Sequence, residues 1–104
     1  MAEVVWTARA RTDLASIGDY VALSSPAVAA ALLRRLLTAV ERLGTFPESG
    51  RVVPVIGDDA MCEIVYRNYR VVYLTLLDED RVEVLTVFHA SRQFGGLPGE
   101  SSPL

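Results

Sequence analysis

The fold is decided by one segment, residues 61–89, which reads MCEIVYRNYRVVYLTLLDEDRVEVLTVFH. It contains three runs rich in β-branched and aromatic residues, at Met61–Tyr66, Tyr69–Leu77 and Val82–His89. Runs of this composition predict β-strands, and the short polar links between them predict antiparallel neighbours. This part of the chain is therefore expected to form an antiparallel sheet.

The run Tyr69–Leu77 is expected to lie at the centre of this sheet. Alternate residues of a strand project to opposite faces. Here both faces are largely apolar, with Val71 and Tyr73 on one and Val72 and Leu74 on the other. A strand that is apolar on both faces is typical of a position covered from both sides.

The N-terminal half predicts one strand and two helices. Glu3–Trp6 is a short β-branched and aromatic run, typical of a strand. Residues 7–23 and 26–43 both carry apolar residues every three or four positions, the pattern of helices with one buried face. Ser25 and Pro26 suit the start of the second helix, because serine caps exposed amides and proline fits the first turn. Helices joined by so short a link lie antiparallel.

The expected fold class is therefore α+β: an N-terminal strand, an antiparallel helical hairpin, and an antiparallel three- to four-stranded sheet packed on the hairpin. The fourth strand candidate is 51–56, which follows a turn containing Pro and Gly at 46–50. Residues 1–94 are expected to form a single domain, and the Gly-, Pro- and Ser-rich residues 95–104 a flexible tail. The residues expected in the core are Leu14, Ile17, Leu33, Leu36, Val40, Val72, Leu74 and Leu85.

The composition excludes several classes of protein. The 104 residues include 10 basic and 13 acidic side chains, for a net charge of -3, with one His and one Cys. One His and one Cys cannot supply the usual four zinc ligands, and no glycine-rich phosphate loop follows a strand, so we expect no metal and no cofactor. No apolar run approaches the roughly 18 residues that span a bilayer. The acidic N-terminus does not resemble a secretion signal, and we expect a cytoplasmic protein.

Basic and aromatic residues gather near the link between the predicted strands Met61–Tyr66 and Tyr69–Leu77. Antiparallel geometry is expected to bring Arg70, His89 and Arg92 to the same end of the sheet, where the arginines would stabilise negative charge and His89 would move protons. An alternative stays open, in which the arginines solvate the sheet rim and the tyrosines pack with their hydroxyls at the surface. The candidates for binding a target are Arg67, Tyr69, Arg70, Tyr73, His89 and Arg92.

Three ordered stretches run through nearly the whole chain. They are Trp6-Thr7 with Asp13-Leu14, then Phe46-Pro47-Glu48-Ser49-Gly50-Arg51, then Tyr69-Arg70-Val71-Val72-Tyr73 followed by Val84–His89 and Arg92. Together they resemble the RelE/ParE superfamily of toxins from bacterial toxin–antitoxin pairs. The resemblance implies the same order of strand, hairpin and sheet. It also implies a partner, a small DNA-binding antitoxin whose C-terminal segment covers the toxin.

Within the superfamily the residues favour a ParE-like toxin, which inhibits DNA gyrase by binding and is not an enzyme. RelE-like ribonucleases resemble one another in two lysines on the strand before the Tyr-Arg turn and in a tyrosine near the C-terminus. Here Met61 and Glu63 stand where the lysines are expected, and no tyrosine follows Tyr73. One alternative is a RelE-like, metal-independent endoribonuclease that cleaves mRNA on the ribosome through Arg70, His89 and Arg92.

A second alternative is a diverged, non-toxic module that only binds an antitoxin. Many ParE-like toxins have an Arg before the Glu of the third strand, where this chain has Cys62. The C-terminal segment, which the resemblance implicates in action on the target, has no aromatic or basic residue after Phe94.

Overall fold

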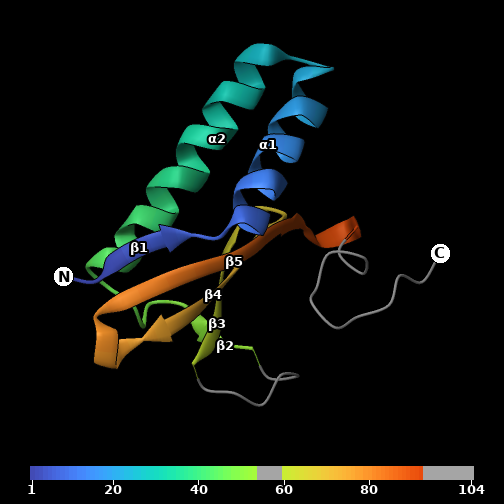
Figure 1. Cartoon of the computed structure of the whole chain (residues 1–104). Helices are drawn as coiled ribbons and strands as arrows, with labels where there is room; N and C mark the ends of the chain where they lie inside the picture. Colours follow the sequence, from blue (N-terminus) through green and yellow to red (C-terminus); the bar gives the residue numbers. More distant parts are fainter. Residues whose placement is uncertain (54–59, 93–104) are drawn as a thin grey trace.

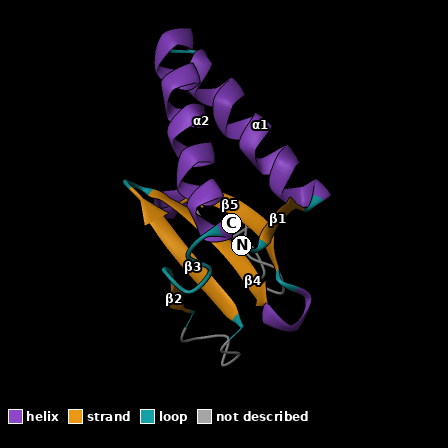
Figure 2. Cartoon of the chain, turned by 90° about the vertical axis from the view of Figure 1, so that its left-hand side faces the viewer, coloured by secondary structure: helices purple, strands orange, loops and turns teal. Residues whose placement is uncertain are grey.

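The structure is a computed structural model that describes residues 1–53 and 60–92. Figure 1 shows the two long helices leaning together above one face of a sheet, and Figure 2 shows the same arrangement after a quarter turn. Within the described ranges, neither helix has the length and apolarity that crossing a bilayer requires. The elements are β1 (Glu3–Trp6), α1 (Ala8–Ala22), α2 (Pro26–Glu41), η1 (Arg42–Gly44), β2 (Arg51–Val52), β3 (Met61–Tyr66), β4 (Tyr69–Leu76), η2 (Leu77–Glu79), β5 (Arg81–His89) and η3 (Ala90–Arg92).

The sheet has five strands in the order β1-β5-β4-β3-β2. Neighbouring strands from β2 to β5 are antiparallel, which confirms the predicted α+β fold. β1 had not been assigned to the sheet from the sequence; it pairs in parallel with β5 and makes the sheet mixed (Figure 1). The predicted strand 51–56 is present as Arg51–Val52, while residues 54–59 and the predicted tail 95–104 lie outside the described residues.

Both helices begin where the sequence predicts. The Thr7 hydroxyl accepts a hydrogen bond from the Ala10 amide, and the Ser25 hydroxyl accepts one from the Val28 amide, each at 3.2 Å. These bonds satisfy amides that have no partner inside the helix. The Thr7 hydroxyl also donates to the Val84 carbonyl at 2.8 Å, which fastens the start of α1 to β5.

Asp13 on α1 covers the edge of β5 beyond the end of β1. β1 pairs with β5 only as far as Trp6 opposite Val84, and no other strand among residues 1–53 and 60–92 pairs with the next residues of β5 on that side. There the Asp13 carboxylate accepts hydrogen bonds from the Thr86 hydroxyl and, at 3.3 Å, from the Val87 amide. A side chain thus takes the place of a strand and protects an otherwise open edge.

The main core lies between α2 and the helix-facing side of the sheet. Leu36 and Val40 are buried there as predicted, and Leu14 and Ile17 pack against this core while partly exposed. Val72 is also buried as predicted, but on the opposite face of the sheet. The buried residues that form this cluster are Ala10, Leu36, Val40, Leu43, Cys62, Tyr69, Val71, Tyr73, Val82, Val84 and Val87.

The prediction that Leu33, Leu74 and Leu85 lie in the core is wrong, because all three are only half-buried. Leu85 falls at a bulge, where Val72 pairs with Thr86 but Tyr73 already pairs with Val84, so Leu85 has no partner. Leu74 follows Tyr73 and projects from the face away from the helices. Leu33 lines a shallow groove between α1 and α2 together with Leu14 and Leu37.

Candidate functional site

Four of the predicted site residues, Arg67, Tyr69, Arg70 and His89, lie at or next to the two-residue link between β3 and β4, at one end of the sheet. Tyr66 is paired with Tyr69 across this link, and Tyr69 is paired with His89 on β5. Arg67 in the link has a φ of 54°, a left-handed backbone that reverses the chain tightly. The end of the sheet that the sequence pointed to is therefore formed by β3, β4 and β5 together.

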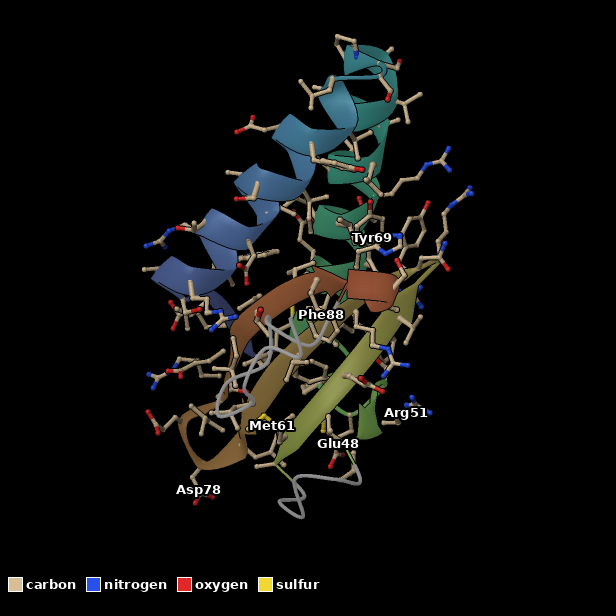
Figure 3. The ribbon with its side chains drawn as sticks, turned by 90° about the vertical axis from the view of Figure 1, so that its right-hand side faces the viewer. Glu48, Arg51, Met61, Tyr69, Asp78 and Phe88 are labelled. Carbon is tan, nitrogen blue, oxygen red and sulfur yellow. The ribbon has the colours of Figure 1, made fainter. Side chains whose placement is uncertain are left out.

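Arg70 and His89 reach this end of the sheet but lie on opposite faces. His89 and Tyr69 meet edge to face, with ring centroids 5.0 Å apart, on the side of the helices. Arg70 is paired with Phe88, one residue along each strand, and so projects from the other face. Figure 3 shows Tyr69 on the helix side of β5 and Phe88 on the far side. Arg92 closes η3, and its side chain lies outside the described part of the chain.

His89 already uses one of its ring nitrogens. Its Nδ1 atom accepts a hydrogen bond from the Ser91 amide at 3.2 Å and lies 2.6 Å from the Ser91 hydroxyl. An amide can only donate, so the neutral ring carries its proton on Nε2. The nitrogen lone pair with which His89 would remove a proton is thus engaged by its own chain.

Tyr73 is an internal anchor for the turn before β2. Its side chain is fully buried, and its hydroxyl accepts from the Gly50 amide at 3.0 Å and donates to the Pro47 carbonyl at 3.1 Å. Burial raises the pKa of Tyr73 to about 12. The expectation that Tyr73 touches a target does not fit this position, because no surface of the residue is exposed.

A charged cluster crosses β2, β3 and β4 on the face away from the helices. The Glu63 carboxylate lies 2.6 Å from Arg51 Nη2 and 3.5 Å from Arg70 Nη1. The Glu63 side chain is 4% exposed, while those of Arg51 and Arg70 are 63% and 41% exposed. Arg51, which stands opposite Glu63 in the strand register, neutralises the Glu63 carboxylate.

A second cluster joins α2 to the β3–β4 link. The Tyr66 hydroxyl accepts hydrogen bonds from Arg35 Nη1 at 3.4 Å and from Arg67 Nε at 3.2 Å. These two bonds lower the pKa of Tyr66, with Arg35 the larger cause. The sequence did not indicate Arg35 as a site residue, because its partner Tyr66 is 31 positions away along the chain.

This second cluster forms the rim of a groove between the helical hairpin and the sheet. The floor is mainly apolar, and Val28 on it is 57% exposed. A groove with an apolar floor and two guanidinium groups on its rim suits a peptide segment with apolar and acidic side chains. We call it the hairpin groove; it is lined by Val21, Val28, Ala31, Leu32, Arg35, Tyr66, Arg67 and Tyr69.

Comparison with known sequences gives a consistent result. Residues 4–94 match the model of the family described as the ParE toxin of type II toxin–antitoxin systems. The chain is 35% identical over 89 residues to the putative toxin Y4kP of Sinorhizobium fredii, covering 86% of this chain and 88% of that protein. It is 48% identical over 52 residues to the toxin RelE2 of Caulobacter vibrioides, a match that spans 50% of this chain and only 59% of that toxin.

Two solved structures share the fold. A chain of the chromosomal ParDE system from P. aeruginosa superposes with a TM-score of 0.70 at 20% identity, covering 86% of this chain and 96% of that one. A chain of the toxin–antitoxin complex RelBE2 from Mycobacterium tuberculosis gives a TM-score of 0.59 at 21% identity, covering 85% and 90% of the two chains. At these identities the likeness concerns the fold alone.

Proposed function

Because the chain belongs to the ParE toxin family of type II toxin–antitoxin systems, we propose that it acts by binding DNA gyrase, without cleaving RNA, and that a cognate antitoxin neutralises it. The observation that carries this proposal is the placement of Arg70 and His89 on opposite faces of the sheet. A binding inhibitor needs no convergence of these two side chains, whereas a ribonuclease does.

RNA cleavage requires a proton-transferring group and a cation at the same phosphodiester, each within hydrogen-bonding distance of the atoms that react. Arg70 lies 3.5 Å from the Glu63 carboxylate, which competes with a phosphate for its guanidinium group, and the sheet separates Arg70 from His89. The Nδ1 lone pair of His89 is held by Ser91. These three features favour a toxin that binds its target over one that cuts RNA.

The first prediction concerns the target. When the chain is expressed without its antitoxin, we expect thymidine incorporation to fall before amino-acid incorporation, and the purified protein to inhibit supercoiling by gyrase. His89→Ala should leave both effects within about threefold of the wild type, because removing a general acid or base would instead lower a cleavage rate by roughly a hundredfold or more.

The opposite order of events would overturn the proposed target. If translation stops first, transcripts are cut on ribosomes and gyrase is untouched, the RelE-like alternative holds. If growth is unaffected while an antitoxin still binds, the chain is a non-toxic binding module.

We further propose that the antitoxin, expected from a short gene adjacent to this one, places apolar and acidic side chains of its C-terminal segment in the hairpin groove. The apolar floor supplies area to bury, and the Arg35 and Arg67 guanidinium groups supply partners for acidic side chains. Val28, one of the α2 residues that line the groove, is 57% exposed and adds apolar area for the partner to cover.

The second prediction concerns this groove. Arg35→Glu and Arg67→Glu should each weaken antitoxin binding by about tenfold or more, because each places a negative charge where an acidic partner docks. Arg34→Glu is the matched control, since Arg34 is an exposed residue of the same helix outside the groove lining. Calorimetric titration with the antitoxin measures the difference. Equal losses for Arg34→Glu and Arg35→Glu would exclude the hairpin groove as the docking site.

A further inference from the structure

We propose that Arg51, Glu63 and Arg70 form a phosphate-binding site that Glu63 itself occupies, so that this residue prevents the sheet face from binding phosphate groups. The ligand class that Glu63 excludes is a phosphate, either free or in a nucleic-acid backbone. This inference concerns the sheet face away from the helices and does not rest on the proposed target.

The strand register brings the three side chains together. Arg51 on β2 stands directly opposite Glu63 on β3, and Glu63 stands opposite Val72 on β4. Arg70 precedes Val72 by two residues and therefore shares its face, in the diagonal position from which a long side chain reaches Glu63. Three adjacent strands thus direct two guanidinium groups at one point of the sheet.

The contacts at that point are those of an oxyanion receptor. Arg51 places Nε and Nη2 each 2.6 Å from Glu63 Oε2, while Arg70 places Nη1 3.5 Å from Oε1. Arginines bind carboxylates and phosphates in the same way, by donating guanidinium hydrogen bonds to the oxygen atoms of the anion. Here the anion is part of the protein.

The two arginines of the cluster face solvent, whereas the Glu63 carboxylate between them does not. Glu63 is nearly fully buried, whereas Arg51 and Arg70 keep 63% and 41% of their side-chain surface exposed. A single ion pair would suffice to neutralise Glu63, yet the cluster contains two cations and one anion. Removing the negative charge of Glu63 would leave two adjacent guanidinium groups on the surface without an anion between them.

A phosphate that approaches this face of the wild-type chain meets the Glu63 carboxylate where its own oxygens would have to lie. Because Glu63 is part of the chain, its carboxylate holds the Arg51 donors without the translational entropy that a free phosphate loses on binding, so an external phosphate competes poorly for them. Arg70, whose Nη1 atom is 3.5 Å from the carboxylate, is held less closely than Arg51 at 2.6 Å. Glu63 therefore excludes phosphate by occupying the site, although the cluster as a whole carries one net positive charge.

The test compares variants by phosphate binding. Inorganic phosphate and, in a separate arm, a fluorescent single-stranded RNA of ten nucleotides are titrated into wild type, Glu63→Gln and Glu63→Ser. We expect both variants to bind each probe at least about tenfold more tightly than wild type. In NMR spectra recorded during the titration, the largest changes in backbone amide chemical shift should occur at residues 51, 63 and 70. Adding Arg70→Ala to either variant should abolish the gain.

Glu83→Gln is the matched control, because Glu83 is a β5 carboxylate that contacts an arginine, Arg81 at 3.1 Å, and its loss changes the net charge equally. Two Glu63 variants are made so that the test can be carried out if only one of them folds. Circular dichroism shows which variants are folded. Tight phosphate binding by wild type would overturn the proposal, and so would a gain no larger than that of Glu83→Gln. Binding of inorganic phosphate without RNA would restrict the site to free phosphate. Neither result depends on gyrase, whose inhibition is measured separately.

Discussion

Replacing Leu36 by alanine is expected to lower the free energy of unfolding by about 2 to 5 kcal/mol, the range for emptying a buried leucine site. Leu36 has no exposed surface and belongs to the cluster between α2 and the sheet. The loss combines the transfer free energy of the deleted carbons with a cavity that close-packed neighbours fill only in part. Small domains are stable by only about 5 to 15 kcal/mol, so this single change removes a large share of the total. Urea denaturation followed by circular dichroism measures it.

The adjacent residue provides the control for this prediction. Leu37 lies on the same helix but is 39% exposed, and Leu37→Ala should cost about 1 kcal/mol or less. If Leu36→Ala costs under about 0.5 kcal/mol, the packing of α2 on the sheet is not as described here.

The local elements of the fold could be predicted from the sequence because their signals are local. Thr7 and Ser25 cap the helices they precede, and β3, β4 and β5 follow the predicted runs. The parallel pairing of β1 with β5 could not be predicted in this way, because it joins residues almost eighty positions apart. The bulge that exposes Leu85 was missed for a related reason, since strict alternation assumes an unbroken register.

The candidate site was predicted in part. Strand order alone places Arg70 and His89 at one end of the sheet. The residue-by-residue pairing of β4 with β5 decides on which face each side chain lies. In this pairing Phe88 is opposite Arg70 and His89 is opposite Tyr69, so Arg70 and His89 lie on different faces. The arginines that complete the two charged clusters belong to β2 and α2. Their contacts arise from tertiary packing, which no spacing in the sequence indicates.

The burial of Tyr73 is indicated by its place in the strand pattern. It shares a strand face with Val71, and a face that carries apolar residues is the one that becomes buried. The hydroxyl then needs partners inside the protein, and the turn at 47–50 supplies them. Gly50 is required there, because a Cβ atom at this position would collide with the Tyr73 hydroxyl and the Glu63 carbonyl.

The last prediction concerns this anchor. Tyr73→Ala should lower the free energy of unfolding by about 3 to 5 kcal/mol, as expected for a large buried aromatic residue. Tyr73→Phe keeps the ring and removes only the hydroxyl, which leaves the Gly50 amide and the Pro47 carbonyl without their partner, at a cost of about 1 to 3 kcal/mol. Urea denaturation at pH 8 compares the two variants with wild type. Equal losses would mean that the hydroxyl, and not the ring, stabilises the fold.

The pH dependence provides an independent check on the same hydroxyl. In the unfolded chain Tyr73 ionises with a pKa near its ordinary value of 10, whereas burial in the folded chain raises the pKa to about 12. Between these values the unfolded chain loses a proton that the folded chain keeps, so ionisation favours unfolding. The stability that Tyr73 contributes is therefore intact below pH 10 and falls by up to about 2 to 3 kcal/mol as the pH rises to 12. Tyr73→Phe has no proton to lose there, and its stability should decline less than that of wild type between pH 8 and pH 11.5. If both proteins decline in parallel, the Tyr73 hydroxyl is not buried in the folded state.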